Sequence, residues 1–199
     1  YVMEDDSLAF KDSISKYIKS EKTFYKVAER LEYLQNKKTG RFKIAKDIGN
    51  NDIVNSLKFN NTPINVTFNN QERVEDLAGR VSKQIYEDST SLLSAFRDKK
   101  FLEDNNLNEQ NVLSIFIPKC YNIYWNSTPE DFRDRMLAEY NKFWNKDRSE
   151  KAKKLGLTKL EVISLASIVQ IESRRNDERP RVAGLYINRL KRNMRLQAD

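Results

Sequence analysis

Glu172 lies on the apolar side of a predicted helix, and this placement points to acid–base chemistry. The helix is predicted to begin after Thr158, because Thr158 and Glu161 form a capping-box pattern ahead of an apolar run. At about 100° per residue, Glu172 shares a stripe with Leu165 and Val169. A carboxyl group among apolar neighbours keeps its proton more readily, as a general acid must. We therefore expect Glu172 to be a partly desolvated acid.

The following predicted helix carries an arginine near its apolar side. The residues expected on its inward face are spaced three and four apart: Val182, Leu185, Tyr186 and Leu190. Arg189 projects between two of these directions, and a guanidinium there needs an anion from a side chain or a substrate. A structural ion pair between Glu172 and Arg189 is the alternative to a catalytic role.

Both helices belong to a longer motif of fixed spacing. Its residues are Ala166-Ser167-Ile168-Val169, Glu172, Glu178-Arg179, Val182-Ala183, Asn188-Arg189-Leu190, Met194, Leu196-Gln197 and Asp199. This pattern closely resembles the catalytic motif of the YceG-like family, the bacterial endolytic murein transglycosylases. The resemblance implies that Glu172 is the catalytic acid, because it stands where the family's first motif closes on a glutamate.

A weaker resemblance extends toward the N-terminus. Residues 39–44 and 51–57 look like the LysM-like module that precedes the catalytic region in this family. The resemblance implies an α+β fold with a small LysM-like α/β module over residues 1–66. A mainly helical, lytic-transglycosylase-like catalytic domain is expected over residues 67–199, incomplete at its C-terminal end. We expect residues 1–199 alone to bind glycan weakly and to show little turnover.

The resemblance also implies a reaction with one acid. The acid protonates the glycosidic oxygen between N-acetylmuramic acid and N-acetylglucosamine, and then removes the proton of the muramoyl C6 hydroxyl. A cation beside Glu172 would oppose the first step, so Arg189 is expected to pair with Asp199 or Glu178, or to hold substrate. Glu178 also precedes Pro180 at a predicted helix start, where an acidic side chain favours the helix dipole.

Other motif positions are predicted to bind substrate: Asn188, Arg189, Gln197 and Asp199. Capping and loop bracing after the second helix would explain these side chains equally well. Tyr121 is a further candidate, with Tyr124 and Trp125 as possible sugar-stacking neighbours, whereas Phe143 and Trp144 are expected in the core. Tyr121 follows Lys119 and Cys120 where family members usually have a Pro-Asp-Thr-Tyr-like turn.

Composition narrows the possible chemistry. The chain has one cysteine and no histidine, which excludes an intramolecular disulfide, His-based triads and His metal sites. We expect no metal and no cofactor, since no phosphate-cradling glycine-rich loop is present. The net charge of +7 suits an anionic partner, for which peptidoglycan, an anionic membrane surface and nucleic acid compete. Charge alone does not choose among them. No nucleic-acid motif is found, and the resemblance implies peptidoglycan glycan strands as the partner.

The resemblance implies a place in the cell. No apolar run approaches the roughly 18 residues of a membrane span. Family members normally carry a single N-terminal transmembrane anchor, which would lie upstream of Tyr1. We therefore expect a single-pass protein of the bacterial inner membrane, with its catalytic part on the periplasmic side and cell-wall synthesis proteins as partners. A non-catalytic peptidoglycan-binding or scaffold module is the alternative function.

Apolar periodicity predicts the elements that position these residues. Helices are expected over residues 7–35 in two parts divided near Ser20, and over 50–59, 73–87, 89–97, 109–116 and 129–144. Strands are expected at 40–45 and 64–68, while residues 117–125 form a strand or an extended wall of the site. Residues 146–156 are a linker or an exposed helix.

Overall fold

The computed structural model describes residues 10–11 and 14–197. The chain forms two compact units, each built from two stretches of sequence. The first unit comprises Tyr1–Asp98 and Pro118–Arg133, and the second comprises Lys99–Ile117 and Asp134–Asp199. Helices dominate both units, and one small antiparallel sheet is found in the described residues, so the predicted α+β class is confirmed.

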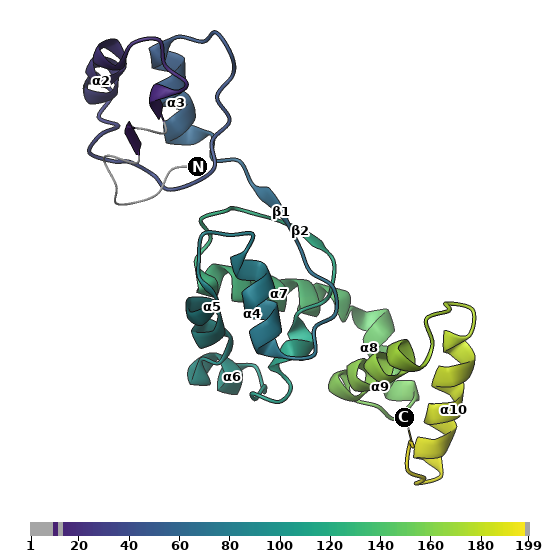
Figure 1. The fold of residues 1–199 in the computed structure, drawn as a ribbon. Coiled ribbons are helices and arrows are strands. Elements are labelled where there is room, and N and C mark those ends of the chain that lie inside the picture. The colour runs from purple at the N-terminus through teal and green to yellow at the C-terminus, as the bar shows by residue number, and fades with distance from the viewer. Residues whose placement is uncertain (1–9, 12–13, 198–199) are drawn as a thin grey trace. The chain divides into compact units, whose positions relative to one another are not determined.

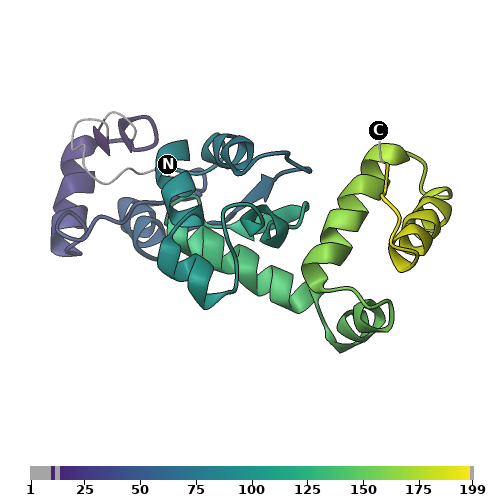
Figure 2. The same cartoon turned by 90° about the horizontal axis from the view of Figure 1, so that it is seen from below.

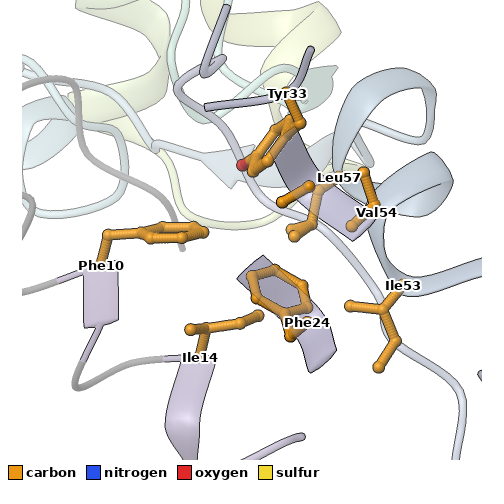
Figure 3. Close-up of a cluster of buried hydrophobic side chains, with 8 residues drawn as sticks. Phe10, Ile14, Phe24, Tyr33, Ile53, Val54 and Leu57 are labelled. Carbon is orange, nitrogen blue, oxygen red and sulfur yellow. The ribbon is translucent and has the colours of Figure 1, made fainter. Parts of the chain in front are cut away.

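The N-terminal part of the first unit packs two helices around an aromatic core (Figure 3). Helix α2 (Glu21–Arg30) contributes Phe24 and Ala28, and helix α3 (Asn50–Phe59) contributes apolar residues at three- and four-residue spacing. Phe10 and Tyr33 meet in this core with ring centroids 5.9 Å apart. The division predicted near Ser20 and the helix predicted at residues 50–59 are both confirmed.

The strand predicted at residues 40–45 is not formed. In its place the described residues have isolated bridge positions, and one of these bridges joins Phe42 to Asn61. Gly40 explains part of this irregular path, because a Cβ atom at Gly40 would lie 2.7 Å from the Asn61 side-chain oxygen. The chain approaches Asn61 as only glycine allows, and it donates the Arg41 N–H to that same oxygen at 3.1 Å.

A two-stranded ribbon joins distant parts of the first unit (Figure 1). Strand β1 (Ile64–Thr67) pairs antiparallel with β2 (Cys120–Ile123), with Ile64 opposite Ile123. Burial alternates along both strands, as a ribbon with one covered face requires. The predicted boundary between residues 66 and 67 falls inside β1, so the compact units are divided differently from the predicted domains.

The rest of the first unit is helical. Helix α4 (Val74–Ser82) packs on α5 (Ser89–Phe96). Helix α5 matches its predicted bounds to one residue, whereas α4 ends at Ser82 and not at the predicted residue 87. Asp88 caps α5 by accepting the Ser91 N–H at 2.7 Å, and this hydrogen bond lowers the pKa of the Asp88 carboxyl. Arg133, on α7 (Pro129–Phe143), is buried and donates to the Ala95 carbonyl at 3.1 Å.

The second unit carries the motif. Its described elements are α6 (Lys99–Asp104), the 3₁₀ helix η1 (Val112–Ile115), the remainder of α7, α8 (Lys146–Lys154), α9 (Lys159–Glu172) and α10 (Arg179–Lys191). Helix α6 was not predicted, and the helix expected at residues 109–116 is the short η1. Trp144 is buried as expected, whereas Phe143 stays exposed. None of the helices described here is long and apolar enough to cross a bilayer.

Candidate functional site

Helices α9 and α10 pack against one another and lie side by side in both views (Figures 1 and 2). The capping box predicted for α9 is present. Thr158 Oγ1 accepts the Glu161 N–H at 3.2 Å, and the Glu161 carboxylate accepts the Thr158 N–H at 2.7 Å. Leu165, Val169 and Tyr186 form the buried centre of the pair. These contacts fix the axis of the helix that ends in Glu172.

Glu172 is the last residue of α9, and its side chain is exposed. The predicted burial among apolar residues is therefore wrong for the structure described, although Leu165 and Val169 on the same stripe are buried. Ile171, next to Glu172, is also 77% exposed, whereas Val169 and Ser173 on either side are buried. Within residues 10–11 and 14–197, no hydrogen bond or ion pair engages the Glu172 carboxylate. The alternative of a buried Glu172–Arg189 ion pair is excluded by this exposure.

A hydrogen-bonded turn follows Glu172 directly. Ser173 is buried, with Oγ 3.0 Å from a Glu178 carboxylate oxygen, and the same Oγ accepts the Arg175 N–H at 3.2 Å. The Arg179 Nε–H donates to the Ser173 carbonyl at 3.2 Å. Glu178 thus occupies the predicted N-terminal position of α10, and its carboxylate braces the turn. Together these bonds hold the backbone that carries Glu172.

Arg189 folds the following segment back onto α10. Its Nη1 donates to the carbonyls of Arg195 at 3.1 Å and Leu196 at 2.6 Å, and to Gln197 Oε1 at 3.1 Å. The expected pairing of Arg189 with Glu178 is wrong, because main-chain carbonyls take the guanidinium instead. Asp199, the other predicted partner, lies outside the described residues. Leu196 packs against the α9–α10 core, so Arg189 secures the end of this unit.

The outer face of α10 departs from the pattern expected of it. Val182 and Tyr186 face the core as predicted, but Leu185 is 54% exposed and Leu190 is also exposed. Ala183 and Ile187 take inward positions instead and pack against the core. The described part of the unit thus leaves apolar side chains of α10 in solvent.

The other predicted binding residues lie in different settings. Asn188 is exposed on α10, and Gln197 adopts a left-handed backbone with φ of 51° while its side chain accepts from Arg189. Tyr121 belongs to β2 in the first unit, is 3% exposed, and stacks on Phe68 with centroids 5.4 Å apart. Tyr121 is therefore a core residue of the first unit, whereas Glu172 belongs to the second.

An open apolar groove of about 490 Å³ runs along the α9–α10 pair. Leu165, Val169 and Ala183 are among its apolar walls, and Gln170, Asn176 and Arg179 contribute polar groups. Glu172 itself does not line this groove. Sequence reasoning missed Ser173, Asn176 and the bracing role of Arg179; the adjacency of Ser173 to Glu172 and the Glu178-Arg179 pair in the motif were the available signals.

The surroundings of Glu172 are basic. Arg174, Arg175 and Arg181 are exposed on the turn and on the start of α10. Arg175 donates to Asp177 at 2.9 Å, and this bond lowers the pKa of the Asp177 carboxyl. Throughout the described part of the chain, no group of three or more Cys, Asp or Glu side chains is placed to hold a metal ion. The site therefore offers one unpaired carboxylate among cations that suit an anionic ligand.

Two curated relatives, from two strains of Streptococcus pneumoniae, are named endolytic murein transglycosylase. Each is 35% identical to this chain over 82 residues, which are 41% of this chain and 15% of the relative. The aligned part therefore spans less than a fifth of either relative. A solved YceG-like protein from Listeria monocytogenes matches 96% of this chain over 66% of its own length, with a TM-score of 0.53 and 20% identity. This likeness shows a shared fold.

One family model spans almost the whole sequence. The model of the YceG-like family matches residues 9–199, which include the motif around Glu172 and the α9–α10 pair. This chain therefore belongs to the YceG-like family.

Proposed function

We propose that this chain carries the catalytic glutamate of an endolytic peptidoglycan transglycosylase. The curated relatives bear that name, and the family match covers the motif that ends α9. The observation that carries the proposal is the position of Glu172. Its carboxylate is exposed at the end of a capped helix, is held by a braced turn, and has no partner among the described residues.

The first step is protonation of the leaving group. The protonated Glu172 donates its proton to the oxygen that links C1 of N-acetylmuramic acid to N-acetylglucosamine. The C1–O bond then breaks, with positive charge developing at C1. Because Glu172 is exposed here, the sugar rings themselves must cover it and exclude water during this step.

The second step closes a ring. The Glu172 carboxylate removes the proton of the C6 hydroxyl of the same muramoyl residue, and O6 bonds to C1. The products are a 1,6-anhydromuramoyl end and a free N-acetylglucosamine end, and Glu172 is protonated again. No water is consumed, so one carboxyl group serves as acid and then as base. This differs from the two carboxylates of an ordinary glycosidase.

Neighbouring residues have supporting roles in this proposal. Asn188, Gln197 and Asp199 supply side chains that can hydrogen-bond sugar hydroxyl and N-acetyl groups. Arg189 donates hydrogen bonds to the Leu196 carbonyl and the Gln197 side chain, and it therefore positions the segment that follows α10. Ser173 and Arg179 position the backbone of Glu172. Nascent glycan strands at the bacterial cell wall are the proposed substrate, with cell-wall synthesis proteins and a membrane anchor outside these residues as proposed associations.

The products of glycan digestion test the proposal. Full-length protein is incubated with purified glycan strands, and the products are identified by mass. Transglycosylation predicts new internal cuts whose muramoyl ends are lighter by one water than hydrolysed ends. Hydrolysed ends would show a glycosidase instead. Binding of strands without any new ends would favour the alternative, a non-catalytic binding or scaffold module.

A further inference from the structure

The ribbon of β1 and β2 leaves a sheet edge open. In the described residues the sheet has two strands, so each strand pairs on one side only. The other side of an edge strand presents main-chain N–H and C=O groups with which an extended peptide can pair. We call the side of β1 that faces away from β2 the outer edge of β1. The contacts along this edge decide whether it is closed or available.

A side chain closes the C-terminal end of the outer edge of β1. Gln84 Oε1 accepts the Thr67 N–H at 2.9 Å, and Gln84 Nε2 donates to the Thr67 carbonyl at 3.0 Å. A residue of a third strand would exchange the same two hydrogen bonds with Thr67. Because Gln84 takes the Thr67 N–H, Thr67 and Cys120 form a non-hydrogen-bonded pair of the β1–β2 ladder. This assignment fixes the direction of the main-chain groups along β1.

Asn65 is the open position of the outer edge of β1. Main-chain directions alternate along a strand, so the N–H and C=O of Asn65 point the same way as those of Thr67. Two residues earlier, the Pro63 carbonyl accepts Arg41 Nη1 at 3.3 Å, and proline has no N–H to offer. Among residues 10–11 and 14–197, no group bonds the Asn65 N–H or carbonyl on this edge. The edge therefore has one open residue between two that side chains occupy.

A pocket of about 540 Å³ lies beside Asn65, on the polar face of the ribbon. Asn65 and Asn122 are opposite each other in the register and line this pocket, whereas Val66 and Tyr121 are buried on the other face. The Asn122 Nδ2 donates to Asn65 Oδ1 at 3.4 Å. Opposite residues of neighbouring strands share a face. A peptide residue paired with Asn65 would therefore direct its side chain into the pocket.

The charges of this pocket favour an acidic side chain. Arg41 and Lys43 line it, and no acidic residue is among its described lining. Lys43 is exposed and, within the part of the chain that the structure describes, has no hydrogen-bond or ion-pair partner. Arg41 holds the Pro63 carbonyl through Nη1, which leaves its other guanidinium N–H groups for a ligand. Two cations at the place where a side chain would enter suit a carboxylate.

We propose that the outer edge of β1 binds an extended, acidic segment of a partner protein. In an antiparallel pairing, one residue of the segment exchanges two hydrogen bonds with the Asn65 main chain, and its Asp or Glu side chain enters the pocket beside Arg41 and Lys43. A free anion could satisfy the cations but cannot donate to the Asn65 carbonyl, so a peptide fits the site better. This inference concerns a protein partner and does not rest on the proposed reaction at Glu172.

Nuclear magnetic resonance titration of the full chain tests this proposal with matched peptides. The first is acetyl-Ser-Thr-Val-Glu-Val-Thr-Ser-amide, whose only charge is the glutamate. The second has glutamine in its place, and the third carries an N-methyl group on the glutamate nitrogen, which removes the N–H that would donate to Asn65. We expect saturable shifts of the amides at residues 41–43 and 64–67 with the first peptide. The second should bind about two- to fivefold more weakly, and the third at least about threefold more weakly.

The controls decide between a peptide site and a simple anion site. Equal binding of the first peptide and either of the other two would overturn the proposal. An equally strong response of the same amides to inorganic phosphate would overturn it as well, as would the lack of a saturable response.

Paired variants of the chain locate the binding. Asn65→Pro removes the open N–H but keeps the ladder groups of Ile64 and Val66, so it should abolish binding of the first peptide at an unchanged melting temperature, whereas Asn65→Thr should retain binding. Lys43→Gln should weaken the first peptide about two- to fivefold and leave the glutamine peptide unchanged. Lys46→Gln, at an exposed lysine outside the pocket, should change neither. Full binding by Asn65→Pro, or equal losses in the two lysine variants, would contradict the assignment.

Discussion

At the scale of single residues, the side chains of Ser173, Arg179 and Arg189 hold the segments near Glu172 through hydrogen bonds. From its spacing, Arg189 was predicted to lie near the apolar side of its helix and to pair with an anion. In the structure, its guanidinium instead binds two carbonyls and the Gln197 side chain. Main-chain acceptors leave no trace in a residue pattern, so this partner could not be predicted. Because the partners of Arg189 are uncharged acceptors, the expected loss of unfolding free energy on replacing Arg189 is smaller than for a buried ion pair.

Replacing Arg189 with methionine should release the segment 194–197. Methionine keeps the aliphatic stem but donates no hydrogen bond, so the free energy of unfolding should fall by about 1–3 kcal/mol. Urea denaturation gives that value, and hydrogen exchange at the Leu196 amide should quicken. Arg181→Met, an exposed change on the same helix, is the control. Matching stabilities for the two variants would place the Arg189 guanidinium in solvent.

Tyr33 should make the stability of the first unit depend on pH in the alkaline range. Burial raises the pKa of Tyr33 to about 12, and its hydroxyl has no hydrogen-bond partner in the described chain. A raised pKa in the folded state means that stability is complete below the ordinary tyrosine value of about 10 and is lost as pH rises through about 12. Tyr33→Phe should therefore flatten the fall in stability over this range.

Denaturation curves between neutral pH and about pH 12 provide the test, with exposed Tyr17→Phe as control. Burial also raises the pKa values of Tyr25 and Tyr140, so some slope should remain in every variant. At neutral pH, Tyr33→Phe should leave stability unchanged or raise it by up to about 1 kcal/mol, because it removes an unsatisfied hydroxyl. A large loss at neutral pH would show that the hydroxyl has a partner.

At the scale of elements, the starts of helices were predictable because caps are local. The residues that form the capping box at Thr158 and the helix at residues 50–59 are close to one another in the sequence. The strand expected at 40–45 failed because the close approach of Gly40 to Asn61 is a long-range contact. The exposure of Glu172 was missed for a similar reason. Periodicity gives the direction of a side chain, but whether another element covers it depends on tertiary packing.

Removing the α9 cap should loosen the helix that carries Glu172. Thr158→Ala should lower the free energy of unfolding by about 1 kcal/mol, while Thr158→Ser keeps the hydroxyl and should cost less. The Thr158 N–H bond lowers the pKa of Glu161, so the contribution of Glu161 is present above the ordinary glutamate value and is lost as pH falls through the lowered pKa. Urea denaturation at neutral pH and near pH 3 measures both effects.

The Thr158→Ala variant keeps the backbone N–H that the Glu161 carboxylate accepts, so its stability should still fall at acidic pH through Glu161. Glu161→Gln should make the fall in stability at acidic pH smaller. An unchanged stability in Thr158→Ala would mean that the cap contributes nothing to the folded unit.

Ser173→Ala tests the braced turn. It removes the hydroxyl that links Glu178 and Arg175, so the free energy of unfolding should fall by about 1–2 kcal/mol and turnover should fall with little change in KM, because Glu172 loses its fixed position. Ser164→Ala, an exposed change on α9, is the matched control. If both variants keep wild-type turnover, the turn has no positioning role.

At the scale of the whole molecule, both compact units are discontinuous in sequence. The ribbon of β1 and β2 pairs residues 64–67 with 120–123, a pairing that no local pattern specifies. This explains why a boundary at residue 66 was expected where the structure has the middle of a strand. The family motif, in contrast, lies wholly in one unit, so its elements could be placed before the fold was known.

One comparison tests most directly whether Glu172 is the acid of this protein. Full-length Glu172→Gln and Glu150→Gln proteins, the latter changed at an exposed residue of α8, are compared with wild type on purified glycan strands. Glutamine keeps the size of the side chain but cannot donate a carboxylic proton. Formation of anhydro ends should fall about 10²- to 10⁴-fold in Glu172→Gln alone, at an unchanged melting temperature. Near wild-type formation of anhydro ends by Glu172→Gln would contradict the proposed mechanism.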